Sequence, residues 1–174
     1  MRAVRRARVW LKVALGNLRP VWKQVAVLEA NPSTTVTGAV QIERSVHMDE
    51  HVTLIGPAGA SGGGLVVGEG VRLGRFVSVL CAASIRIGPG ADLGDHATVI
   101  DSWAPVPASG RRGVPAPSPA PVVIGAGARL GPGAVVGPGV TIGDGAVVAP
   151  GAVVVGDVPA GGWAVGNPAS VDHQ

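Results

Sequence analysis

The sequence predicts an all-β solenoid, in which short strands joined by regular turns wind into coils that stack on one another. Three observations predict it. An aliphatic residue recurs every six positions in residues 124–153, a tight-turn dipeptide recurs at the same interval, and the chain combines 28 Gly and 15 Pro with only four Trp, one Phe and no Tyr. A period of six fits neither an amphipathic helix nor an alternating strand. The period also argues against the disorder that a high Gly and Pro content would otherwise suggest.

The clearest repeats lie in residues 124–153. The aliphatic positions of this stretch are Ile124, Leu130, Val136, Ile142 and Val148. The turn pairs that follow two places after the last four are Pro132-Gly133, Pro138-Gly139, Asp144-Gly145 and Pro150-Gly151. Proline presets φ at the first central position of a turn, and glycine accepts a positive φ at the second. Each six-residue unit is therefore expected to be a short strand followed by a turn.

The same period is present earlier in the chain, with interruptions. Its aliphatic or Met positions are Val36, Ile42, Met48, Leu54, Val67, Leu73, Val79, Ile87, Leu93 and Val99. Residues 56–64 form a Gly-rich insertion, two extra residues precede Ile87, and residues 101–121 form a long loop. With the five later positions and Val154, 16 hexads result, which at three per coil predict about five coils. Loops longer than about 12 residues are usually functional, so residues 101–121 are where a site is expected.

The chain is expected to divide into a basic arm (residues 1–23), the solenoid (24–159) and a tail (160–174). Seven of the 14 basic residues and none of the 11 acidic ones lie in the arm, which leaves the remainder with a net charge of −4. Residues 2–18 predict an amphipathic helix that ends near Gly16 and Pro20. This helix either caps one end of the solenoid or rests on anionic lipid, and a leader or a misassigned start is the third interpretation.

Composition restricts the compartment and the class of protein. The chain has no run of about 18 apolar residues and no secretory signal pattern, and its single Cys81 excludes an intrachain disulfide. These features predict a cytoplasmic protein, with membrane association through the arm as the alternative. No dinucleotide motif, phosphate loop or nucleic-acid-reading module is present.

From Val67 to the C-terminus, the sequence resembles the hexapeptide-repeat acyltransferases, and most closely their maltose and galactoside O-acetyltransferase branch. The hexads carry the resemblance, together with Pro138-Gly-Val-Thr-Ile-Gly-Asp-Gly145, Asp157-Val-Pro159 and Val165-Gly-Asn-Pro-Ala169. It implies a left-handed parallel β-helix, whereas the general rule for parallel crossovers predicts the right-handed sense. It also implies a homotrimer, with acetyl-CoA in the cleft between neighbouring helices and a catalytic His near the base of the long loop.

The chain departs from that branch at three places. The position that the branch fills with His holds Ala104, or Trp103 if the alignment shifts by one. Val155-Gly156 stands where the branch has Thr-Lys on the cofactor, and Ser170 stands where Lys is common.

His96 is the candidate general base that remains. Its surroundings, Leu93-Gly-Asp-His-Ala-Thr98, resemble a stretch of the serine acetyltransferases in which the His is catalytic. His96 falls on a turn position of its hexad, so a solvated turn histidine is the alternative interpretation.

The remaining candidates have simpler interpretations. His47 and His51 are expected at the surface, on different faces, and Cys81 is expected as a packed small hydrophobe. Too few histidines are present for the zinc site found elsewhere on this fold, so no metal is expected.

Two functions from different classes follow. The first is an acetyl-CoA-dependent O-acetyltransferase acting on a sugar or polysaccharide precursor. Its base would be His96, or a His supplied by a neighbouring subunit or by a loop rearrangement. Its acceptor would contact Asp101, Arg111 and Arg112, although Asp101 is equally well explained as a loop-start turn residue. Its cofactor would contact Pro132, Gly133, Pro150, Gly151, Val155 and Gly156. The second is a catalytically lapsed member of the family that acts as a structural or interaction scaffold.

Overall fold

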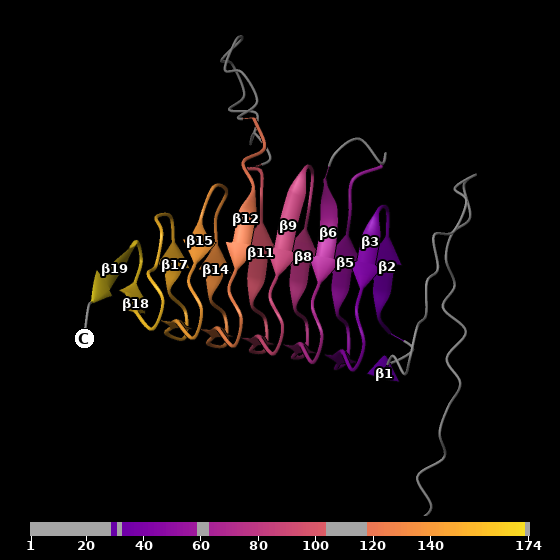
Figure 1. Ribbon diagram of the computed structural model, residues 1–174, viewed down its shortest axis with the longest axis horizontal. Helices are drawn as coiled ribbons and strands as arrows, with labels where there is room; N and C mark the ends of the chain where they lie inside the picture. Colours follow the sequence, from indigo (N-terminus) through magenta and orange to yellow (C-terminus); the bar gives the residue numbers. More distant parts are fainter. Residues whose placement is uncertain (1–28, 31–32, 59–62, 104–117, 173–174) are drawn as a thin grey trace, which may run out of the picture.

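The structure is a computed structural model that describes residues 29–30, 33–58, 63–103 and 118–172 (Figure 1). Every regular element in these ranges is a β-strand. The expected helix at residues 2–18 lies outside them. No helix in the described ranges is long and apolar enough to cross a membrane.

The strands form three sheets, which we call A, B and C. Sheet A contains β1 (Glu29–Ala30), β4 (His47–Met48), β7 (Arg72–Leu73), β10 (Asp92–Leu93), β13 (Arg129–Leu130), β16 (Val147–Val148), β18 (Trp163–Gly166) and β19 (Ala169–Asp172). Sheet B contains β2 (Thr35–Thr37), β5 (Thr53–Ile55), β8 (Ser78–Leu80), β11 (Thr98–Ile100), β14 (Val135–Val136) and β17 (Val153–Val154). Sheet C contains β3 (Val40–Ile42), β6 (Gly64–Val67), β9 (Ser84–Ile87), β12 (Val122–Ile124) and β15 (Thr141–Ile142).

The chain visits the three sheets in rotation, so that it winds as a three-sided parallel β-helix (Figure 1). From β2 to β16 it passes through sheets B, C and A five times, which confirms the expected number of coils. Each strand pairs in parallel with the strand one coil later, as β7 does with β10 and β10 with β13.

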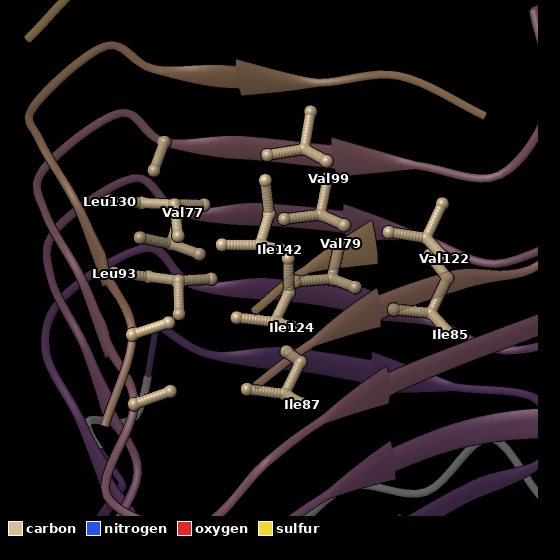
Figure 2. Packing of buried hydrophobic residues seen from close by; sticks show 14 of the residues in the cluster. Val77, Val79, Ile85, Ile87, Leu93, Val99, Val122, Ile124, Leu130 and Ile142 are labelled. Atoms are coloured by element: carbon tan, nitrogen blue, oxygen red, sulfur yellow. The ribbon is translucent and has the colours of Figure 1, made fainter. Parts of the chain in front are cut away.

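The core is a set of columns of aliphatic side chains. The pairing places Leu73 beside Leu93 and Leu93 beside Leu130, and the same register joins Val79 to Val99 and Ile87 to Ile124. Figure 2 shows side chains from different strands converging on the interior, among them those of Leu93, Val99 and Ile124. The hexad positions from Met48 onward are all buried, while Val36 and Ile42 in the first coil are half-buried. The periodic residues of the sequence are therefore the core, as expected.

The turns confirm the role expected of glycine and add a feature that the sequence did not reveal. Gly133, Gly139, Gly145 and Gly151 all have a positive φ, between 65° and 76°. Four residues with side chains adopt the same conformation, with φ between 57° and 60°: Ser45, His51, Phe76 and His96. This backbone region is unfavourable for residues other than glycine, so these turns are held by the packing of the coils around them.

The interruptions of the period gather at one edge of the prism. We call the connections from sheet B to sheet C the B–C corner; they are residues 38–39, 56–63, 81–83, 101–121, 137–140 and 155–157. The Gly-rich insertion, the two extra residues before Ile87 and the long loop are three successive members of this corner. The other two corners keep a connection of four residues in every coil from β3 to β17.

The solenoid continues past the point at which the hexads end. β18 pairs in parallel with β16, and β19 folds back antiparallel on β18. Ala164 of β18 is fully buried, so the core extends into this final hairpin, at the end of the stack opposite β1 and β2 (Figure 1).

Neighbouring residues of β15 test the role of the columns. We expect Ile142→Ala to lower the free energy of unfolding by about 2–5 kcal/mol, because the side chain is fully buried and its removal leaves a cavity. Thr141→Ala, one residue earlier on the exposed face, should change it by less than about 1 kcal/mol. Equal losses for the two variants in chemical denaturation would contradict the inward assignment of the hexad residue.

Candidate functional site

Asp101 stabilises the base of the long loop through hydrogen bonds to the backbone. Its side chain is fully buried, and its carboxylate accepts the backbone N–H groups of Ala82 at 2.7 Å, Ala83 at 2.7 Å and Ser84 at 2.8 Å. Its backbone carbonyl accepts the N–H of Ala120 at 2.8 Å. Charge-assisted bonds of this kind offset the cost of burying a carboxylate. Asp101 thus ties the start of the loop to the preceding coil and to the end of the loop.

Cys81 lies in the same corner, one residue before the backbone that Asp101 holds. Burial, and after it the nearby Asp101 carboxylate, raise the pKa of the Cys81 thiol to about 11. The side chain is buried in the core. The thiol therefore stays protonated at neutral pH, which confirms its interpretation as a packed small hydrophobe.

The side chain of Trp103, two residues after Asp101, packs against the following coil. If Gly137 had a Cβ atom, that atom would be only 3.0 Å from Cζ2 of Trp103, so the indole contacts the bare backbone of Gly137. Gly137 in turn donates its N–H to the carbonyl of Val154 at 2.9 Å. Trp103 and Val155 are both exposed. Of the two positions expected for a loop histidine, Trp103 is described and Ala104 is not.

His96 lies at a different edge, the A–B corner, which comprises the connections 49–52, 74–77, 94–97, 131–134 and 149–152. Its exposed ring stacks on Phe76 with centroids 4.9 Å apart, and Phe76 stacks on His51 at 4.8 Å. Hydrogen bonds between turns continue this column, from Gly133 N–H to Asp95 carbonyl and from Gly151 N–H to Pro132 carbonyl. His96 therefore shares its corner with four expected cofactor residues, Pro132, Gly133, Pro150 and Gly151.

The charged groups next to His96 are paired. Arg75 donates to the Asp95 carboxylate from its backbone N–H at 2.9 Å and from its guanidinium at 2.7 Å. These hydrogen bonds lower the pKa of Asp95 below its usual value. Asp95 is therefore ionised at neutral pH, beside the imidazole of His96.

One chain does not bring all the candidate residues together. From His96 to Asp101 the backbone runs through β11, and five extended residues span about 16 Å. Sheet B thus separates two groups: His96 and the Pro-Gly turns on one border, and Asp101, Trp103, Val155 and Gly156 on the other. Thr98, Ile100, Val135 and Val153 line the face between them. Arg111 and Arg112 lie outside the described residues.

The other histidines of the early coils lie where they were expected. His47 on β4 and His51 in the A–B corner are both exposed. Within the described ranges, no three His, Cys, Asp or Glu side chains gather as metal ligands would.

Comparison with known proteins agrees with this architecture. Residues 121–156 match the sequence model of the family described as bacterial transferase hexapeptide (six repeats). Comparison with curated protein sequences gives no significant match.

Solved structures of three acyltransferases share the fold. A mutant of AntD, an N-acyltransferase from Bacillus cereus in complex with dTDP and coenzyme A, is 16% identical over 81% of this chain and 77% of its own, with a TM-score of 0.67. A maltose O-acetyltransferase from Clostridium difficile 630 is 27% identical over 82% of this chain and 70% of its own, with a TM-score of 0.51. The polySia-specific acetyltransferase NeuO is 20% identical over 82% of this chain and 66% of its own, with a TM-score of 0.65. The resemblance to the hexapeptide-repeat acyltransferases is thus confirmed.

Substitution of the buried Asp101 tests whether its carboxylate stabilises the loop base. We expect Asp101→Asn to lower the free energy of unfolding by about 1–3 kcal/mol, because an amide removes one acceptor and the charge from three backbone N–H groups. Asp144→Asn is the matched control, since that carboxylate is exposed and accepts one N–H, from Ala126. A loss for Asp101→Asn no larger than that of the control in urea denaturation would contradict the fastening role.

The pH dependence of the free energy of unfolding tests the burial of the Cys81 thiol. The folded protein holds the thiol proton up to a pKa of about 11, whereas the unfolded chain releases it near the ordinary thiol pKa of 9.0. Between these values the folded state binds more protons, so stability should fall as pH rises from about 9 to about 11. Cys81→Ala should remove that part of the slope in denaturation curves. An unchanged slope would show that the thiol titrates alike in both states.

Proposed function

We propose that this protein transfers an acetyl group from acetyl-CoA to a hydroxyl of a sugar or polysaccharide precursor. The hexapeptide match and the structural neighbours support it. AntD has been crystallised with dTDP-4-amino-4,6-dideoxyglucose and coenzyme A, and the other two neighbours are a maltose and a polySia acetyltransferase. The single observation that carries the proposal is that all described candidate residues border the outer face of sheet B. The coils would wind in the left-handed sense.

The donor would lie along the late coils of one copy. It would begin at the Pro132-Gly133 and Pro150-Gly151 turns and end at Val155-Gly156. A Cβ on Gly156 would have no atom within 4 Å, which leaves open space at that end. The small turn residues let a pantetheine arm approach the backbone closely. The donor would supply an activated thioester.

A second copy would complete the site. Because His96 and the loop base lie on opposite borders of sheet B, His96 of one copy in a homotrimer would face the loop base of the next. Its imidazole would accept the proton of the acceptor hydroxyl and return it to the departing thiol. Stacking on Phe76 would hold the ring plane while the ring nitrogens stay at the exposed edge.

Three further parts of the proposal rest on the sequence. Arg111 and Arg112 would contact an anionic group of the acceptor. The protein would work in the cytoplasm, and residues 1–23 would contact anionic membrane.

A scaffold is the second candidate function, and two observations favour it. Trp103 stands at one of the two positions expected for histidine, and the Asp101 carboxylate is fully occupied by backbone N–H groups. A lapsed enzyme would keep the solenoid and lose acetyl-CoA binding.

Removal of the proposed base tests the transferase. We expect His96→Ala to lower kcat by about 10²- to 10⁴-fold, the range typical of losing a general base. His51→Ala is the control, since it removes the histidine on the other side of Phe76 in the same column. The measurement is release of free CoA from acetyl-CoA in the presence of an acceptor. Equal rates for the wild type and His96→Ala would remove His96 from the mechanism.

Mixing two defective variants tests whether the site is shared. Val155→Trp should block the donor end of a copy that keeps His96, and both variants alone should be inactive. If the base comes from a second copy, co-refolded mixtures with His96→Ala should regain part of the activity. Mixtures that stay inactive would place base and donor in one chain.

A further inference from the structure

The B–C corner exposes an aromatic side chain that the transfer proposed above does not use. Trp103 keeps 44% of its surface accessible although it is among the most apolar side chains of the chain. The B–C corner also contains Val155, which is 58% exposed. An exposed indole and an exposed valine thus share the corner in which the proposed donor path ends.

The structure holds this indole in place from both sides. On the chain side, Trp103 follows Asp101 by two residues, and Asp101 is fixed by five hydrogen bonds. On the ring side, the indole packs against Gly137, where an added Cβ would lie only 3.0 Å from Cζ2. The ring is therefore held in place while 44% of the residue stays accessible, so a ligand need not order it, which lowers the entropic cost of binding.

The chemistry of this surface suits a sugar. The face of an indole is flat, apolar and electron-rich, and the C–H-lined face of a pyranose is flat and weakly positive. The same corner carries Asp157, whose carboxylate is exposed and oriented by the N–H of Thr141 at 2.7 Å. A carboxylate in the same corner as an aromatic platform can accept hydrogen bonds from sugar hydroxyls.

We propose that Trp103 is the platform on which the acceptor stacks one pyranose ring, at the loop base in the corner that also contains Val155. This inference rests on the proposed function for the identity of the ligand as the acceptor. It gives Trp103 a binding role at a position where the resemblance leads one to look for a base. The hydroxyl to be acetylated would then lie near the donor end at Val155-Gly156.

Sugar binding without donor tests the platform. The probes are maltose and methyl β-D-galactopyranoside, titrated into the full-length protein and followed by saturation-transfer NMR on the sugar protons. We expect Trp103→Ala to weaken binding at least tenfold and Trp103→Phe to retain most of it, since a phenyl ring keeps a stacking face. Trp163→Ala is the matched control, because Trp163 is also 44% exposed but lies on sheet A.

A second variant moves the ring without removing it. Gly137→Ala places a methyl group 3.0 Å from Cζ2, so the indole must shift by a few tenths of an ångström or more, and sugar binding should weaken, though less than in Trp103→Ala. Comparison of its melting temperature with that of the wild type shows whether the variant is folded. Unchanged sugar affinity in a folded Gly137→Ala variant with a displaced Trp103 signal would overturn the platform.

The outcomes separate this inference from the function on which it rests. Sugar binding that depends on Trp103, without any CoA release from acetyl-CoA, would retain the platform and contradict the transferase. CoA release that depends on a sugar but is indifferent to Trp103→Ala would retain the transferase and contradict the platform. Absence of binding would overturn the platform as well. The criterion is that neither sugar binds the wild-type protein at about 20 mM, a concentration above the millimolar dissociation constants that this measurement can detect.

Discussion

The parallel register between coils is the constraint on which the rest of this structure depends. Each aliphatic hexad residue lies beside its counterpart one coil away, as Leu93 does between Leu73 and Leu130. A slip of one residue would turn a whole strand's apolar side chain outward. Because the register is fixed, the place of a residue in its hexad decides whether it faces the core, a sheet surface or a corner.

The same constraint determines where the chain can vary. Extra residues cannot enter a strand without breaking the columns, but they can loop out at a corner. The insertions of this chain lie in the B–C corner. A corner that changes length from coil to coil needs its own fastening. Asp101 provides it by binding the backbone at Ala82, Ala83 and Ser84 in the coil before. The candidate acceptor surface is built on this irregular corner, while the candidate donor path uses the regular A–B corner and the face between.

The sequence predicted the periodic part of the molecule and little of the rest. The hexad positions, the number of coils and the positive φ of the Pro-Gly turns follow from a period of six and the geometry of glycine. The burial of Asp101 could not be predicted. Its partners are the backbone N–H groups of Ala82, Ala83 and Ser84, and the side chains of these residues give no sign of a carboxylate partner. The contact of Trp103 with Gly137 joins two coils across a loop of irregular length, to which no period applies. The stacking of His96 on Phe76 had a signal in the sequence, since both occupy the turn position that glycine takes in later hexads.

The proposed transfer requires that this solenoid binds an acyl donor along sheet B. Calorimetric titration of acetyl-CoA into the full-length protein measures that binding. We expect a dissociation constant in the micromolar range, about −8 kcal/mol of binding free energy. Absence of binding at millimolar acetyl-CoA would contradict it, and would leave the stacked coils as a scaffold whose partner is still to be found.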